Sequence, residues 1–207
     1  MNIKNNHLVI MAGGVGSRFW PMSTPDYPKQ FIDVLGCGRT LIQLTADRFQ
    51  GICPPENIWV VTSEKYADTV KEQLPDIADD HILREPCRRN TAPCIAYVSW
   101  KIKARNPKAN MVVTPSDHIV MNIAEFQRVI NSAMNFTADS DAILTLGMNY
   151  LLETGYGYIE ADLSVPSTAN KEVFRVYSFK EKPDLETARR YIQKIISFGM
   201  PVFLCGM

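Results

Sequence analysis

Four short apolar runs, separated by segments of helical period, constrain the fold of this chain more than any other feature. The runs occupy residues 8–10, 58–61, 111–113 and 142–144. None of them alternates apolar with polar residues, and continuous apolar runs of this length are typical of strands that are buried on both faces. Such strands occur in parallel sheets whose two faces are covered by helices.

Between these runs, apolar residues recur every three or four positions, as they do along one face of a helix. The sets are Ile42, Ala46 and Phe49; Ala67, Val70 and Leu74; Ile95, Val98 and Ile102; and Phe126, Ile130 and Ala133. Asn122, followed by Glu125 three residues later, is typical of a helix start. Alternating strands and helices predict an α/β fold, a Rossmann-like three-layer α/β/α domain with a mainly parallel sheet. In this fold the ligand site lies beyond the carboxyl ends of the strands.

From about residue 155 the pattern becomes β-rich. Residues 155–163 and 172–182 read as strands joined by the polar turn 164–171, and a helix is predicted to start after Pro183 and Asp184. Its apolar side carries Leu185, Ala188, Ile192 and Ile195. We interpret this region as a second, more open part of the same domain.

The composition excludes several function classes. Lysine plus arginine and aspartate plus glutamate number 22 each, so no bulk charge attracts nucleic acid or an anionic membrane. No apolar run approaches the roughly 20 residues that cross a bilayer, and the first ten residues lack a signal-peptide core. The five cysteines form no C-x-x-C pair, which favours a reducing cytoplasm over a zinc site or a disulfide framework.

The turn after the first apolar run, in "MAGGVGSRFWPMSTPDYPKQF", contains Gly13, Gly14 and Gly16, followed by Arg18 and Lys29. It is neither a dinucleotide fingerprint, because Phe19 stands at the third glycine position, nor a Walker loop, because no lysine follows Gly16. Glycines let consecutive amides approach an anion, while arginine and lysine grip phosphate oxygens. The alternative is a tight structural turn that carries two charges.

Other candidates also have two readings. Asp117 directly follows a buried strand, where a carboxylate suits Mg²⁺, but Ser116–His118 also fits a simple turn or cap. Asn90 or Thr91 can cap a helix whose first turn holds Pro93.

The segments further along are equally ambiguous when read alone. Gly155 and Gly157 flank Tyr156, which indicates close approach of the backbone to a ligand within a strand-like run. Glu181 and Lys182 belong to "KEKP", which by itself reads as a solvated charge run.

Five motifs in order extend this picture over essentially the whole chain. They are "GGVGSRFWPMS" with "PKQF", then "EPCRRNTAP", "TPSDH", "ETGYGYIE" and "FKEKPD". Together they resemble the signature of sugar-1-phosphate nucleotidyltransferases. Within that family, the sequence is similar to the mannose-1-phosphate guanylyltransferases, also called GDP-mannose pyrophosphorylases. The resemblance implies a nucleotide-diphospho-sugar transferase fold. It also implies in-line attack of mannose 1-phosphate on the α-phosphate of GTP, giving GDP-mannose and pyrophosphate with Mg²⁺.

The resemblance also implies residue roles. The residues expected to bind the nucleotide are Gly13, Gly14, Gly16, Ser17, Arg18, Asn90, Thr91 and Asp117. Arg18, Lys29 and Asp117 would be catalytic, and Asp117 would hold the metal. The sugar phosphate would contact Gly155, Tyr156, Gly157, Glu181 and Lys182. Residues 1–150 would then be a nucleotide-binding half, and residues 151–207 the start of a sugar-phosphate-binding half.

Two departures from the family keep alternatives open. The segment before "TGYG" is short and lacks the family's proline, and Phe203, Leu204 and Cys205 stand where members carry tryptophan, asparagine and serine. The chain stops at Met207 within this motif, whereas members continue to a second metal-binding aspartate. We therefore keep as alternatives a truncated nucleotide-binding module without catalysis and a nucleotidyltransferase for another sugar 1-phosphate. Members are frequently dimeric, so a homodimer is one expected assembly.

Overall fold

The computed structural model of the chain describes residues 3–14, 16, 19–87, 90–147, 157–194, 197–198 and 203–206, with side chains through Arg189. The chain forms two compact units, Met1–Ala142 with Leu204–Met207, and Ile143–Phe203. The predicted boundary between residues 150 and 151 lies outside the described residues. Within the described part of the chain, no helix has the length and apolar character needed to span a membrane.

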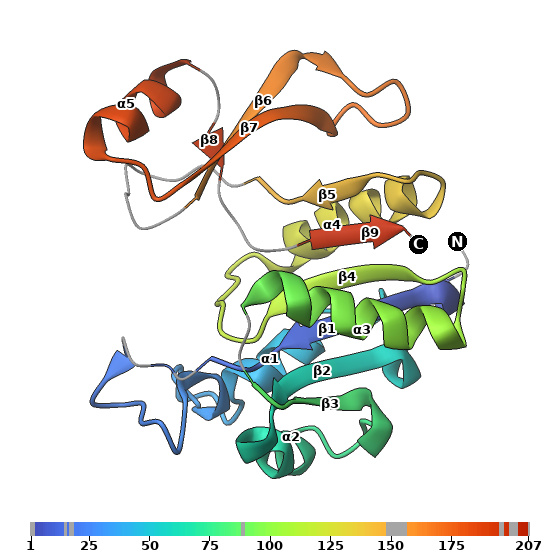
Figure 1. Cartoon of the computed structure of the whole chain (residues 1–207), viewed down its shortest axis with the longest axis vertical. Helices are drawn as coiled ribbons and strands as arrows, with labels where there is room; N and C mark the ends of the chain where they lie inside the picture. The colour runs from blue at the N-terminus through green and yellow to red at the C-terminus, as the bar shows by residue number, and fades with distance from the viewer. Residues whose placement is uncertain are drawn as a thin grey trace. The chain divides into compact units, whose positions relative to one another are not determined.

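The first unit contains a mainly parallel sheet (Figure 1). Within this unit, its strands are β1 (Asn6–Met11), β2 (Ile58–Ser63), β3 (Ile82–Glu85), β4 (Asn110–Pro115) and, from Leu204 onward, β9 (Phe203–Gly206), in the spatial order β3-β2-β1-β4-β9. The strand β1 pairs in parallel with both β2 and β4, and β2 pairs in parallel with β3. The predicted α/β class and parallel sheet are confirmed.

Four helices follow strands of this sheet: α1 (Leu41–Asp47), α2 (Ala67–Gln73), α3 (Thr91–Arg105) and α4 (Ile123–Ala138). Helix α1 packs on β1, α2 on β2 and β3, and α4 on β4. The apolar runs of β1 and β4 are buried throughout, and that of β2 is buried from Trp59 to Val61, as their lack of alternation predicts. Helix α4 begins as expected, because the Asn122 side chain accepts a hydrogen bond from the Glu125 amide at 3.0 Å.

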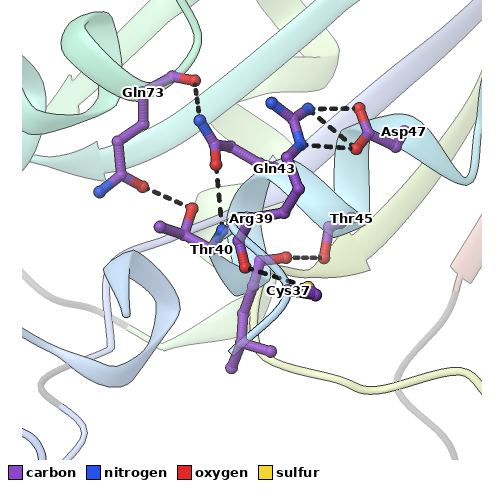
Figure 2. Close-up of polar contacts among 8 residues, drawn as sticks. Cys37, Arg39, Thr40, Gln43, Thr45, Asp47 and Gln73 are labelled. Atoms are coloured by element: carbon purple, nitrogen blue, oxygen red, sulfur yellow. Dashed lines mark hydrogen bonds and ion pairs between the residues drawn. The ribbon is translucent and has the colours of Figure 1, made fainter. Parts of the chain in front are cut away.

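The start of α1 is tied to the end of α2 by amide side chains (Figure 2). Gln43 accepts a hydrogen bond from the Thr40 amide at 3.0 Å and donates one to the Gln73 carbonyl at 2.9 Å. Gln73 in turn donates to the Phe31 carbonyl at 3.0 Å. Phe31 ends the 3-10 helix that begins at Lys29, so this network fixes the segment that carries Lys29.

The second unit contains the short strand β5 (Ile143–Thr145) and an antiparallel sheet of order β7-β6-β8, with β6 (Gly157–Pro166), β7 (Phe174–Glu181) and β8 (Ser197–Phe198). The two predicted strands are confirmed within the described residues, but β6 continues through residues 164–166, which were expected to belong to the turn. The helix predicted after Asp184 is confirmed as α5 (Leu185–Lys194). Its start is stabilised by Asp184, which accepts from the Thr187 amide at 2.8 Å.

One prediction about the strands is wrong. The run 142–144 was expected to be buried on both faces, but Ile143 is 71% exposed. The strand β5 is only three residues long. An apolar run this short does not reveal whether other elements cover it.

Candidate functional site

The carboxyl ends of β1, β3 and β4 lie at one edge of the parallel sheet. The register pairs Met11 with Pro115 and with Val61, and Ser63 with Glu85, so these strands end nearly level. The Ser116 amide donates to the Met11 carbonyl at 3.2 Å, which joins the end of β4 to the end of β1. Polar residues that follow these strands are therefore brought to a common edge, where ligands bind in folds of this kind.

The glycine turn follows β1 at this edge. Gly16 has a φ of +66°, and a Cβ added there would lie 3.0 Å from the Lys29 amide nitrogen and 3.1 Å from Ser23 Oγ. The turn is thus folded directly onto the Lys29 segment, and only glycine fits both the dihedral angle and the space. Two other residues of this turn with predicted roles, Ser17 and Arg18, lie outside the described residues.

Gln30 holds this turn in place; it belongs to the motif "PKQF", which marked its position without indicating this role. Its buried amide nitrogen Nε2 donates to the Gly14 carbonyl at 2.8 Å and to the Ala12 carbonyl at 3.2 Å. The Thr62 hydroxyl also donates to the Ala12 carbonyl, at 3.0 Å. All three hydrogen bonds are accepted by backbone carbonyls of the turn, so none of them occupies a backbone amide of the turn.

Lys29 and Asp117 form an ion pair at the same edge. The distance between Lys29 Nζ and Asp117 Oδ2 is 2.8 Å, and the two side chains are 31% and 30% exposed. His118 Nε2 lies 3.8 Å from Asp117 Oδ1. Burial lowers the pKa of His118, although the Asp117 charge opposes this shift. The structure thus brings two of the predicted catalytic residues together, with the His118 imidazole beside them.

Arg48 supports the loop that carries Asp117 by a hydrogen bond to its backbone. The Arg48 side chain is buried, and it donates hydrogen bonds to the His118 carbonyl at 2.9 Å and to Thr45 Oγ1 at 2.6 Å. Its guanidinium also lies 5.6 Å from the ring centre of Phe126. Burial lowers the Arg48 pKa to about 10, while the charge of Asp117 raises it. Its sequence position looks like that of an ordinary charged residue at the end of a helix.

Glu85, the last residue of β3, reaches the glycine turn. A Cβ added to Gly13 would lie 3.6 Å from Glu85 Oε2. Burial raises the pKa of this carboxyl group. Burial also raises the pKa of the Cys94 thiol to about 12, and the charge of Glu85 adds to that shift. Glu85 is the first residue of "EPCRRNTAP", so a motif marked its position without indicating its role.

Asn90 and Thr91 lie at the start of α3. Pro93 occupies the first turn of this helix, as predicted. The predicted side-chain cap is wrong, because Asn90 stands at the N-cap without a capping hydrogen bond and Thr91 is already the first helical residue. Asn90 adopts a φ of +67°, outside the extended conformation in which cap side chains normally reach the helix amides. Both side chains are exposed.

In the second unit, three residues predicted to contact the sugar phosphate lie together. Gly157 pairs with Glu181 across β6 and β7, and Lys182 Nζ lies 3.4 Å from Glu181 Oε1. A Cβ added to Gly157 would lie 2.6 Å from the Phe179 ring and 3.1 Å from Glu181 Oε2, so the space beside this carboxylate depends on glycine. Gly155 and Tyr156, the other members of this predicted set, lie outside the described residues.

The side chains at this edge of the sheet include one that could bind a metal ion, Asp117. Among the described residues, no group of three or more His, Cys, Asp or Glu side chains is arranged to hold a metal. Mg²⁺ does not require such a group, because it is commonly bound by one or two carboxylates together with phosphate oxygens and water. Asp117, partly exposed beside the glycine turn, fits that pattern. The edge therefore combines a cation, a carboxylate and a tight glycine turn, which suits a polyanion with a divalent ion.

Comparisons with known proteins agree with this architecture. Residues 7–206 match the family described as nucleotidyl transferase. The chain is 40% identical over 192 residues to mannose-1-phosphate guanylyltransferase 2 of Escherichia coli O157:H7, covering 89% of this chain and 39% of that protein. It is 37% identical over 207 residues to mannose-1-phosphate guanylyltransferase of E. coli K12, covering 96% and 42%. The chain thus spans about two fifths of the length of these relatives.

Two solved structures share the fold. A protein from Thermus thermophilus, named mannose-1-phosphate geranyltransferase, superposes with a TM-score of 0.86 at 26% identity, over 98% of this chain and 57% of that one. A putative glucose-1-phosphate thymidylyltransferase from Bacillus anthracis superposes with a TM-score of 0.65 at 17% identity, over 97% and 71%. The fold is therefore the one found in nucleotide-diphospho-sugar transferases.

Proposed function

Because this chain belongs to the nucleotidyl transferase family, we propose that it catalyses nucleotidyl transfer from GTP to mannose 1-phosphate. The products are GDP-mannose and pyrophosphate. The names of the relatives support the choice of GTP and mannose 1-phosphate. Because the chain spans about two fifths of the length of these relatives, their activity is proposed for this chain.

The observation that carries this proposal is the Lys29–Asp117 ion pair beside the glycine turn. Nucleotidyl transfer concentrates negative charge around one phosphorus atom, so the protein's main tasks are to position the reactants and neutralise charge. An ammonium group and a carboxylate that share a partly exposed edge are suited to bind, respectively, a phosphate oxygen and its divalent counter-ion. An ordinary structural turn does not require such a pair.

In the proposed mechanism, an oxygen of mannose 1-phosphate attacks the α-phosphorus in line, and the bond to pyrophosphate breaks. The amides of the turn at Gly13, Gly14 and Gly16, with Ser17 and Arg18, bind the triphosphate. Lys29 stabilises the charge that develops on the α-phosphate. Asp117 would hold Mg²⁺, which supplies further neutralisation of the phosphates when bound. No general base is required, because the attacking phosphate is already ionised.

The remaining predicted residues complete the substrate contacts. Asn90 and Thr91 contact the nucleotide from the start of α3. In the second unit, Glu181 accepts hydrogen bonds from sugar hydroxyls and Lys182 pairs with the sugar phosphate, while Gly155, Tyr156 and Gly157 face the sugar ring. We expect the protein to work in the cytoplasm, because a reducing environment keeps thiols free. The described cysteines are free thiols: Cys37, Cys53, Cys87 and Cys94.

The direct test measures pyrophosphate release with each of GTP, ATP and UTP combined with mannose 1-phosphate or glucose 1-phosphate, in the presence of Mg²⁺. Release that is fastest with GTP and mannose 1-phosphate supports the proposal. Saturable binding of Mg²⁺–GTP without release from any pair would instead identify a nucleotide-binding module. Fastest release with another sugar phosphate would reassign the acceptor.

A further inference from the structure

The 3-10 helix Lys29–Phe31 connects the parts of the candidate site. Its first residue, Lys29, pairs with Asp117, and its second, Gln30, holds the glycine turn. The helix is three residues long, and helices of this type have poor hydrogen-bond geometry, so they are weak when short. The orientation of the Lys29 side chain therefore depends on contacts that other elements make with this helix.

Gln73, the last residue of α2, makes one of these contacts. Its amide nitrogen Nε2 donates a hydrogen bond to the backbone carbonyl of Phe31 at 3.0 Å. A carbonyl oxygen can only accept, so the nitrogen of the Gln73 amide must face it and the oxygen must face the other way. The Phe31 side chain is buried, and its ring lies 5.8 Å from that of Tyr66, so this end of the 3-10 helix is held on two sides.

The Gln73 amide is itself held by α1 (Figure 2). Its oxygen Oε1 accepts a hydrogen bond from the hydroxyl of Thr40, the N-cap residue of α1, at 2.7 Å. Its backbone carbonyl accepts from Gln43 Nε2 in the first turn of α1, at 2.9 Å. Partners on both sides of the side chain fix its rotamer, and hydrogen bonds in such a network reinforce one another. An ordinary glutamine at a helix end would be solvated instead.

We propose that Gln73 is a positioning residue for nucleotidyl transfer: it orients the 3-10 helix so that the Lys29 ammonium meets the α-phosphate. This inference rests on the proposed function. Electrostatic stabilisation of a transition state requires a preorganised group, and a displacement of about 1 Å caused by a remote substitution can lower a rate by about 10²-fold. Gln73 acts through Lys29 and not by contact with the substrate.

The test compares Gln73→Glu with Gln50→Glu, which makes the same substitution at an exposed position after α1. At pH 8 a glutamate is ionised, so it still accepts from Thr40 but cannot donate to the Phe31 carbonyl. In Gln73→Glu we expect the kcat of pyrophosphate release to fall by about tenfold or more, while the KM for Mg²⁺–GTP changes by less than about threefold. Gln50→Glu should keep the wild-type values of both.

A double-mutant cycle separates positioning of Lys29 from general support of the site. In a Lys29→Met background, Gln73→Glu should lower the rate by less than about twofold, because the group that Gln73 positions is already absent. A substitution that disturbed the glycine turn or the substrate contacts would lower the rate in both backgrounds.

Hydrogen exchange provides a measurement that does not depend on activity. The amides of Phe31 and Ile32 donate to the carbonyls of Pro28 and Lys29 at 3.0 and 3.1 Å, so their exchange reports opening of the 3-10 helix. We expect this exchange to be faster by about fivefold or more in Gln73→Glu, with unchanged exchange in β4. Gln73→Met, which is uncharged and similar in length, should show the same increase and serves if Gln73→Glu does not fold.

Three outcomes would overturn the proposal. They are unchanged exchange of Phe31 and Ile32 in the Gln73 variants, a kcat of Gln73→Glu within about twofold of the wild-type value, and equal losses of rate in the wild-type and Lys29→Met backgrounds. Absence of pyrophosphate release by the wild-type protein with every substrate pair would reject the proposed function instead. The exchange rates would then decide by themselves whether Gln73 holds the segment that carries Lys29.

Discussion

The guanidinium of Arg48 donates a hydrogen bond to the backbone carbonyl of His118, which lies 70 residues further along the chain, at a distance of 2.9 Å. This bond joins the end of α1 to the loop that carries Asp117. Gln127 strengthens the connection, because its amide Nε2 donates to the Arg48 carbonyl at 3.0 Å. The position of the Asp117 carboxylate therefore depends on a buried cation that binds the backbone of the next residue.

Replacement of Arg48 by methionine should destabilise the protein by about 2–4 kcal/mol, because the His118 carbonyl loses its donor and a well-packed side chain is replaced. Urea denaturation measures this change. Arg128→Met is the matched control: Arg128 is an exposed arginine of α4 paired with Glu125 three residues before it, so its loss should cost less than about 0.5 kcal/mol. Equal costs for the two variants would contradict the supporting role of Arg48.

Replacement of Gly16 by alanine should be more damaging than replacement of Gly38 by alanine. Both glycines have positive φ, +66° and +79°, so both variants suffer backbone strain of about 1 kcal/mol. Only Gly16 has atoms within 4 Å of the added Cβ, including the Lys29 amide nitrogen. We expect a loss of about 2–3 kcal/mol in thermal or urea unfolding for Gly16→Ala, with weakened Mg²⁺–GTP binding. Unchanged binding in Gly16→Ala would argue against a ligand at this turn.

Lys29→Met should separate stability from activity. The Lys29–Asp117 pair is about one-third exposed, and such pairs contribute about 0–1 kcal/mol, so the melting temperature should change little. Pyrophosphate release should fall by about 10²–10³-fold, because charge stabilisation at the α-phosphate is lost. Lys65→Met is the control, since it removes an exposed lysine paired with Asp26 and should leave the rate unchanged.

Asp117→Asn should shift the dependence on magnesium. The amide keeps the size of the side chain but loses the charge that favours a divalent cation. We expect the Mg²⁺ concentration for half-maximal pyrophosphate release to rise about tenfold or more, and EDTA to abolish release by the wild-type protein. An unchanged magnesium dependence in this variant would remove Asp117 from the metal site.

His7 should make stability depend on pH between about 6.5 and 4. Burial, followed by the charge of His81, lowers the His7 pKa from 6.5 to about 4, and its Nδ1 accepts a hydrogen bond from Trp59 Nε1 at 3.2 Å. In this interval the unfolded chain binds the proton that the folded protein excludes. The free energy of unfolding therefore falls as pH falls, by on the order of 3 kcal/mol for this group.

The measurement is urea denaturation from pH 7 to pH 4 for the wild-type protein and for His7→Gln. Carboxyl groups whose pKa is lowered, such as that of Asp80 beside Arg105, also reduce the free energy of unfolding as the pH falls. Both proteins contain these groups, so the difference between the two curves reports His7. We therefore expect a shallower dependence on pH in His7→Gln. Parallel curves for the two proteins would exclude His7 as the source of the difference.

Much of the fold and part of the site follow from local patterns. The buried runs of β1, β2 and β4 and the helical periods between them predict the parallel sheet, because periodicity directly reports which faces are buried. Placement of Lys29 and Asp117 near one edge follows from the same rule, since each follows a strand of that sheet. The exposure of Ile143 was not predictable, because it depends on what packs against β5.

By itself, the sequence determined that this chain folds as α/β with a parallel sheet, and which charged residues stand after its strands. These properties depend on the spacing of apolar residues and on turn chemistry, which are local. Only the tertiary structure decided that Gln30 holds the glycine turn, that Arg48 supports the Asp117 loop, and that Glu85 reaches across β2 to Gly13. The physical reason is that each of these contacts joins segments far apart in the chain, so it exists only once the strands and helices have packed.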